Sequence, residues 1–158
     1  MQNAIDLAHA LGIDLPKVAI LSAMETVTPK LPSSMDAAAL SKMADRGRIT
    51  GGIVDGPLAF DNAVSLAAAK TKGIKSAVAG DADILVVPNL ESGNMLAKQL
   101  EYLGGTQAAG IVMGARVPIV LTSRADSAHS RIASCAITLL LIDHRKKLAT
   151  EAQAKIQA

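Results

Sequence analysis

The chain has 158 residues, half of them apolar, which suits a single domain with a sizeable aliphatic core. Phe60 and Tyr102 are the only aromatic residues, and this argues against a protein that stacks the bases of single-stranded nucleic acid. The formal net charge is only +2, and the 16 Lys and Arg residues are spread along the chain except at 145–147. We therefore expect no nucleic-acid partner.

The cysteine content and the lengths of the apolar runs indicate the cellular compartment in which we expect the protein. Cys135 is the only cysteine, so no intrachain disulfide can form, and a reducing compartment is the simple inference. The longest apolar run, residues 132–142, is interrupted by Ser134 and Thr138 and is well short of the about 20 residues that a membrane-spanning helix needs. No secretory signal opens the chain. We expect a soluble, cytoplasmic protein without a membrane partner.

Helix and strand patterns alternate along the first half. Apolar residues at helical spacing predict the first helix, and a short apolar run after Pro16 predicts a strand buried on both faces. Glycines and short polar side chains mark where the helices end and begin. In chain order we expect a helix at 3–11, a strand at 17–23, a helix capped by Ser33 or Ser34 that ends near Gly47, a strand at 52–54 ending in Asp55-Gly56-Pro57, and a helix at 62–72 capped by Asp61.

The same alternation continues through the second half. We expect a strand at 84–87, a helix from Glu91 or Ser92 to Leu103, strands at 110–113 and 118–121, a helix from Asp126 or Ser127 to about His144, and a weakly helical or frayed tail at 149–158. Such alternation predicts an α/β fold with a mostly parallel sheet and helices on both faces. No Gly/Ser-rich linker divides the chain, so we expect one domain, residues 1–147, followed by the tail, residues 148–158.

Polar residues follow the last expected strand. Thr122-Ser123-Arg124 comes directly after residues 118–121. The Arg124 guanidinium is a planar fork of donors that can hold two phosphate oxygens at once, and Ser123 can donate to a phosphoryl or carbonyl oxygen. Two structural alternatives stay open: Arg124 caps the strand end, or it pairs with Asp126. Asp126 itself can act as a base or as the N-cap of the next helix.

Two strand-to-helix turns are candidate binding segments. Residues 88–94 place Gly93 where a backbone can approach a ligand closely, and the helix start offers free amides to an anion. Asn89, Glu91 and Asn94 can orient a ligand or simply fix the turn. In the other turn, Asp55 before Gly56 can contact a substrate or tie the turn by an Asx hydrogen bond.

The remaining reactive residues suggest structural roles. His9, His129 and His144 lack metal-ligand spacing, so we expect no metal. Cys135 lies among apolar neighbours and is expected to be a buried, inert thiol. The basic residues 145–147 are expected to compensate the dipole at the end of the last helix. Gly105 and Gly110 are not followed by a P-loop lysine, and no G-x-G-x-x-G occurs.

Three segments carry a resemblance. The motifs DGPLAFDNA at 55–63, VPNLESGN at 87–94 and AAGIVMGARVPIVLTSRADS at 108–127 resemble the phosphate acetyl/butyryltransferase family, over residues 1 to about 147. The resemblance implies a two-domain α/β enzyme of the isocitrate/isopropylmalate dehydrogenase-like fold, with the active site between the domains. The chain would correspond to the second part of such an enzyme, with the first domain missing. It is also similar to the transferase part of fused enoyl-CoA hydratase/phosphate acetyltransferase enzymes.

The resemblance implies a reaction and a set of residues. Acyl-CoA plus phosphate would be interconverted with acyl phosphate plus CoA, for acetyl or butyryl groups, by a homodimer that uses CoA and phosphate as substrates and no cofactor. Ser123 and Arg124 would be catalytic. Acetyl-specific relatives use an aspartate slightly further along, where this chain has no acid at 128–131, so Asp126 or His129 would be the base. Substrate-binding residues would be Asp55, Gly56, Asn89, Glu91, Gly93 and Asn94.

Two other functions stay open. The chain can be a CoA- or phosphate-binding half-module without activity of its own. It can also be a dehydrogenase of the isocitrate or isopropylmalate type, although neither metal-binding aspartates nor a nicotinamide site is evident in the sequence.

Overall fold

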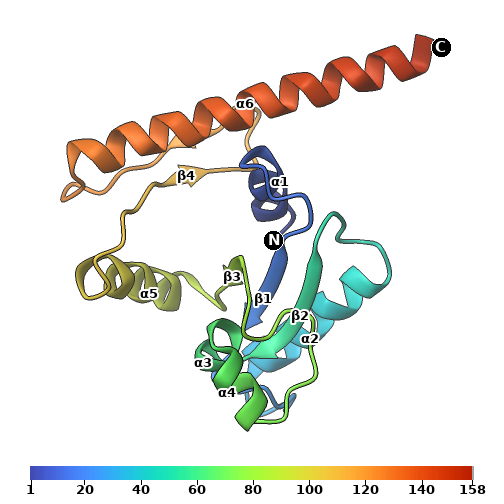
Figure 1. Cartoon of the computed structure of the whole chain (residues 1–158), viewed down its shortest axis with the longest axis vertical. Helices are drawn as coiled ribbons and strands as arrows, with labels where there is room; N and C mark the ends of the chain where they lie inside the picture. Colours follow the sequence, from blue (N-terminus) through green and yellow to red (C-terminus); the bar gives the residue numbers. More distant parts are fainter. Residues whose placement is uncertain (158) are drawn as a thin grey trace. The chain divides into compact units, whose positions relative to one another are not determined.

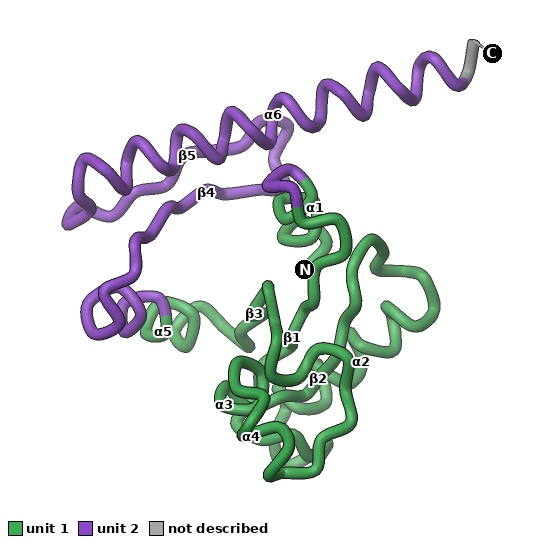
Figure 2. The backbone as a smooth tube through the Cα atoms, in the orientation of Figure 1, with its two compact units in different colours: residues 1–9, 13–96 green, residues 10–12, 97–158 purple. Residues whose placement is uncertain are grey.

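The computed structural model describes the backbone of residues 1–157 and the side chains of residues 1–155. Ala158, the end of the expected tail, lies outside the described residues. The chain divides into two compact units (Figure 2). Unit 1 comprises Met1–His9 and Ile13–Leu96, and unit 2 comprises Ala10–Gly12 and Ala97–Ala158. Each unit is described by itself below.

Unit 1 is built on a three-stranded parallel sheet. The strands are β1 (Lys17–Leu21), β2 (Ile53–Leu58) and β3 (Ile84–Val86), in the order β2-β1-β3 (Figure 1). The central strand β1 is buried along almost its whole length. Its continuous apolar sequence therefore forms a strand covered on both faces, as expected.

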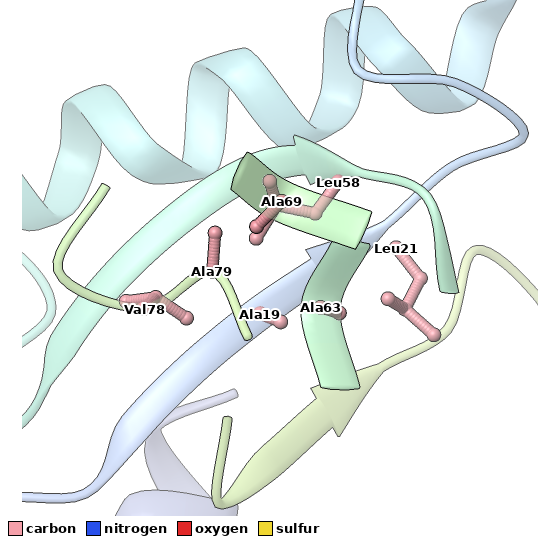
Figure 3. Packing of buried hydrophobic residues seen from close by; sticks show 7 residues of the cluster. All are labelled: Ala19, Leu21, Leu58, Ala63, Ala69, Val78 and Ala79. Carbon is pink, nitrogen blue, oxygen red and sulfur yellow. The ribbon is translucent and has the colours of Figure 1, made fainter. Parts of the chain in front are cut away.

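Two apolar clusters show how helices cover the sheet. On one face, Val18 of β1 packs with Ile5 of α1 (Gln2–Ala10) and with Leu40 of α2 (Pro32–Asp45). On the other face, Ala19 packs with Ala63 of α3 (Phe60–Val64) and Ala69 of α4 (Leu66–Thr71), as Figure 3 shows. Successive residues of a strand point to opposite faces. The expected parallel sheet with helices on both faces is thus confirmed for unit 1.

Several expected boundaries in unit 1 are wrong. Helix α2 begins at Pro32, whose missing N–H is tolerated at the first helical position, and no side chain caps it. The Ser34 hydroxyl instead donates to the carbonyl oxygens of Thr28 and Leu31. The helix expected at 62–72 is two helices, because Ser65 is extended and its Oγ accepts a hydrogen bond from Ala68 N at 3.3 Å, which starts a new helix.

Unit 2 contains an antiparallel pair of strands that does not belong to the parallel sheet. Strands β4 (Ile111–Val112) and β5 (Ile119–Val120) pair antiparallel, and β5 packs on α6 (Ala128–Gln157). Both strands are largely exposed, and among the described residues they pair only with each other. Helix α5 (Leu90–Tyr102) begins in unit 1 and ends in unit 2.

Helix α6 is longer than expected. It continues through Gln157 and does not stop near His144, so most of the segment expected to be weakly helical or frayed belongs to one continuous helix. Its buried face is formed by Ser130, Ser134, Thr138 and Leu141. The Ser134 and Thr138 hydroxyls donate to α6 carbonyl oxygens four residues earlier, Ser134 Oγ to Ser130 O and Thr138 Oγ1 to Ser134 O, each at 2.7 Å. These hydrogen bonds satisfy hydroxyl groups whose burial without a partner would destabilise the fold.

Candidate functional site

The turn after β5 is held by hydrogen bonds between its own residues. The Asp126 carboxylate Oδ2 accepts a hydrogen bond from Ser123 N at 2.7 Å, and Asp126 N donates to Ser123 O at 3.2 Å. The cap of α6 is Ser127, whose Oγ accepts from Ser130 N at 3.1 Å. Asp126 is therefore not the N-cap. Its carboxylate fixes the backbone of Ser123, and Oδ1 has no hydrogen-bond partner within residues 1–155.

Ser123 and Asp126 lie together on the wall of a hollow of about 390 Å³ in unit 2. The hollow is lined by Ala97, Lys98, Glu101, Ala108, Ala109, Gly110, Leu121, Thr122, Ser123 and Asp126. Two of the three residues predicted to be catalytic, Ser123 and Asp126, thus lie on one surface, and the third, Arg124, does not line it. Most of the other lining residues are small and apolar, so polar groups of a substrate would meet few other partners there.

Lys98 and Glu101 are lining residues that the sequence analysis missed. Lys98 Nζ donates to Glu101 Oε2 at 2.7 Å, and this bond, with a weaker contribution from the Asp126 carboxylate, raises the pKa of Lys98 above its ordinary value. Lys98 also lies 5.5 Å from the centre of the Tyr102 ring. The signal in the sequence was the i, i+3 spacing of Lys98 and Glu101 in an expected helix.

Arg124 is exposed, and its side chain makes no hydrogen bond or ion pair with any residue from 1 to 155. The expected alternative in which Arg124 pairs with Asp126 is therefore not found in this part of the chain. Arg124 is not among the residues that line the hollow. Its guanidinium is free to meet an anion from solvent.

The turn at 88–94 has a structural explanation for several of its residues. Asn89 Oδ1 accepts from Ser92 N at 2.9 Å, so Asn89 caps α5. A Cβ on Gly93 would lie 2.8 Å from Val87 Cγ2, so glycine lets the helix start pack on the end of β3. Glu91 and Asn94 are exposed at this helix start and make no hydrogen bond through their side chains within the described residues. They are available to a ligand.

Asp55 and Gly56 lie inside a strand rather than after it. Strand β2 continues to Leu58, so the expected strand end at Asp55 is wrong. Asp55 pairs with Ala19 of β1, and its Oδ1 accepts from Gly56 N at 2.8 Å. A Cβ on Gly56 would lie 2.7 Å from Ile20 Cβ. Close approach of two strands therefore explains this glycine.

The predicted site residues divide between the two units. Ser123, Arg124 and Asp126 belong to unit 2, whereas Asp55, Gly56, Asn89, Glu91, Gly93 and Asn94 all belong to unit 1. A second hollow, of about 380 Å³, lies in unit 1 at the carboxyl ends of β1 and β3 and is lined by Leu21, Pro88, Ser33 and Asp36 among others. The sheet order changes direction between these two strands, which is where ligands of open α/β sheets bind.

Two other expectations are wrong. Cys135 is exposed, because α6 buries its serine and threonine face instead. Residues 145–147 lie well inside α6, so they cannot compensate the dipole at its end.

His129 is exposed, and its Nε2 lies 2.9 Å from Gln107 Oε1. Among the described side chains, no three His, Cys, Asp or Glu residues gather in a way that could hold a metal ion.

The parallel sheet of unit 1, with helices on both faces, defines an α/β protein. The chain belongs to the phosphate acetyl/butaryl transferase family, whose sequence profile matches residues 1–139. A phosphate acetyltransferase of Rickettsia felis is 62% identical over 159 aligned residues, which cover 100% of this chain and 44% of that protein. A phosphate butyryltransferase of Clostridium acetobutylicum is 48% identical, over 92% of this chain and 48% of that protein.

Solved structures agree with this membership. The crystal structure of a branched-chain phosphotransacylase from Enterococcus faecalis V583 matches with a TM-score of 0.79 and 40% sequence identity, over 89% of this chain and 50% of that one. The chain spans about half the length of these relatives, or slightly less. Within the part of the chain that is described, no helix combines the length and apolar character needed to cross a membrane.

Proposed function

We propose that the chain acts in phosphate acyl transfer, in which acyl-CoA plus phosphate is interconverted with acyl phosphate plus CoA, for an acetyl or butyryl group. The observation that carries the proposal is the turn at 122–127, which holds Ser123 and Asp126 on one hollow in a chain of this family. The names of the relatives, phosphate acetyltransferase and phosphate butyryltransferase, support both acyl groups.

The proposed chemistry assigns one role to each residue of the turn. A phosphate oxygen bonds to the thioester carbonyl carbon, the C–S bond then breaks, and CoA leaves as a thiolate that takes up a proton. Arg124 would hold the phosphate by its guanidinium fork, and Ser123 Oγ would donate to the carbonyl oxygen as negative charge develops there. In the reverse direction Asp126, through its free Oδ1, would accept the thiol proton of CoA.

The substrate-binding residues enter the proposal in two ways. Asn89, Glu91, Gly93 and Asn94 would present the start of α5, with its free amides, to a substrate anion. Asp55 and Gly56 would act through the strand that they build. We also propose that the protein is a cytoplasmic homodimer, that its partners are small-molecule substrates, and that it needs no resident cofactor.

A second candidate is a binding half-module that takes CoA or phosphate without turnover. The observation that favours it is that Arg124 does not line the hollow that holds Ser123 and Asp126. The two candidates differ in a single measurable property, because only the first releases free CoA thiol in a phosphate-dependent way.

The test is turnover of acetyl-CoA or butyryl-CoA by the chain, followed as phosphate-dependent release of free thiol. We expect Arg124→Ala to lower the rate by about 100-fold or more, in line with the loss of a transition-state donor. Arg48→Ala, which removes another exposed arginine, is the matched control and should leave the rate unchanged. Wild-type protein that binds CoA but never releases thiol would favour the half-module instead.

A further inference from the structure

We propose that unit 2 carries a second anion site, which binds a phosphorylated nucleoside. The site is a hollow of about 300 Å³, named here the basic hollow, and it is lined by Arg116, Val117, Pro118, Ile142, Arg145, Lys146 and Ala149. All seven residues belong to unit 2. None of them lines the hollow that contains Ser123 and Asp126.

Two elements bring the three cations together. Arg116 lies in the turn between β4 and β5, and Arg145 and Lys146 lie on α6, against which β5 packs. A role at the helix terminus does not explain Arg145 and Lys146, because α6 continues through Gln157 and the dipole acts only within the last turn. The packing of the strand pair on α6 therefore gathers charge that the helix itself does not require.

The cations of the basic hollow form no ion pair with an acid among the described side chains, although Asp143 is near enough to Lys146 to feel its charge. Within residues 1–155, no carboxylate lies within 4.0 Å of the charged groups of Arg116, Arg145 or Lys146. The acid nearest in sequence, Asp143, is held by Lys147 at 2.8 Å. Like charges around one concave surface repel each other and raise the local concentration of anions. A bound anion would remove that repulsion.

The lining also indicates what carries the anion. Two arginine forks suit a phosphate group, which accepts two parallel hydrogen bonds from each. Val117, Pro118, Ile142 and Ala149 offer an apolar surface beside these donors, which suits a flat, weakly polar body attached to the phosphate. A phosphorylated nucleoside combines both features, whereas inorganic phosphate would use only the charged part.

The basic hollow lies away from the proposed reacting groups along the strand. Residues 116–118 precede β5, and Thr122 and Ser123 follow it. An extended strand rises about 3.3 Å per residue, so Pro118 and Ser123 are separated by roughly 17 Å. A ligand in the basic hollow would therefore be bound without reacting. It can be the nucleotide end of a CoA substrate, in which case the inference rests on the proposed function, or a separate phosphorylated regulator.

Calorimetric titration of the chain with adenosine 3′,5′-bisphosphate tests the site directly. We expect saturable binding that weakens as salt rises, and no binding of adenosine. The Arg116→Gln/Arg145→Gln variant should bind at least about tenfold more weakly, because it loses the charge-assisted hydrogen bonds of both arginines. Lys155→Gln, which changes an exposed lysine of α6 outside the hollow, is the matched control and should bind like wild type.

Two results would overturn the site: absence of bisphosphate binding by wild type, or equal binding by the double arginine variant. If that variant does not fold by circular dichroism, Arg116→Lys/Arg145→Lys keeps the charge but loses the forks and should bind with intermediate affinity. Affinity equal to wild type in this lysine variant would also contradict the proposed recognition by arginine forks.

Comparison of CoA with 3′-dephospho-CoA separates the two sources of the ligand. If the nucleotide end of CoA occupies the basic hollow, wild type should prefer CoA, and Arg116→Gln/Arg145→Gln should remove that preference. If the variant loses bisphosphate affinity but binds CoA like wild type, the ligand is a separate regulator. Arg124→Ala should bind the bisphosphate normally, so failure of the proposed catalysis would be distinguishable from failure of this site.

Discussion

At the scale of single residues, Gly56 shows a packing role where a substrate-binding role was expected. It was expected to contact substrate, yet it lies within β2, where a Cβ would be 2.7 Å from Ile20 Cβ and 2.8 Å from Ile20 O. The second contact is to backbone, so rotation of a side chain cannot relieve it. Ser41 Oγ also donates to Gly56 O at 3.1 Å, which holds the strand against α2.

We predict that Gly56→Ala destabilises the fold by about 1–3 kcal/mol, the usual cost of inserting a methyl group into a closely packed region. Chemical denaturation followed by circular dichroism measures this. Measurement without ligand separates the two roles, since a role limited to ligand contact predicts normal stability and weaker CoA binding. A variant as stable as wild type would show that the strands tolerate the methyl group, contrary to the close approach described here.

Residue chemistry in the sequence located part of the candidate site. Arginine and serine after a strand were recognised as a possible anion site, and the structure keeps Arg124 exposed and Ser123 on a hollow. The sequence could not decide what Asp126 does, because two neighbouring residues, Asp126 and Ser127, are both good N-caps. In the folded turn, Ser127 is the N-cap of α6, and the Asp126 carboxylate accepts a hydrogen bond from the Ser123 amide.

At the scale of elements, apolar periodicity predicted where most helices and strands lie, but not their partners. Helix α1 and strand β1 differ from expectation by a residue or two at their ends. The split between α3 and α4 was missed because Ser65 is neither glycine nor proline, and its role as a cap depends on the backbone being extended there. A run of two or three apolar residues, as in β4 and β5, cannot reveal whether it pairs in parallel or antiparallel.

The polar face of α6 explains why the environment of Cys135 was misjudged. Apolar neighbours in the sequence suggested burial, but Ser134 and Thr138 point to the protein and Ile132 and Leu139 to solvent. Ser134 is fully buried, and its Oγ accepts from Gly110 N at 3.0 Å while donating to Ser130 O. This hydroxyl therefore links α6 to the residue before β4.

We predict that Ser134→Ala destabilises unit 2 by about 1–3 kcal/mol, because it leaves the partly buried Gly110 N–H without a partner. The amide exchange rate of Gly110 should rise. Thr150→Ala is the matched control, since Thr150 Oγ1 makes the same kind of bond to a helix carbonyl, Lys146 O, but is exposed and reaches no other element. It should be neutral, and an unchanged exchange rate at Gly110 in Ser134→Ala would contradict the link.

At the scale of the whole molecule, α6 presents an apolar stripe to solvent. Ile132 and Leu139 are 68% and 67% exposed, and Leu140 beside them is 50% exposed. Residues seven apart lie on the same side of a helix, so Ile132 and Leu139 form one stripe, opposite the buried face at 130, 134, 138 and 141. Exposed apolar stripes of this kind are typical of surfaces that another protein surface covers.

We predict that a second copy covers this stripe, as expected for a homodimer, whose symmetry places the same patch on both sides of the interface. Ile132→Lys/Leu139→Lys should convert the dimer to a monomer, because the interface would have to bury two unpaired charges from each subunit. Size-exclusion chromatography with light scattering measures the change. Leu148→Lys is the matched control: it changes an exposed leucine of the same helix that lies off the stripe, and it should leave the dimer intact. A wild-type chain that is monomeric at high concentration would rule out this use of the stripe, because the fraction of dimer rises with the concentration of the chain.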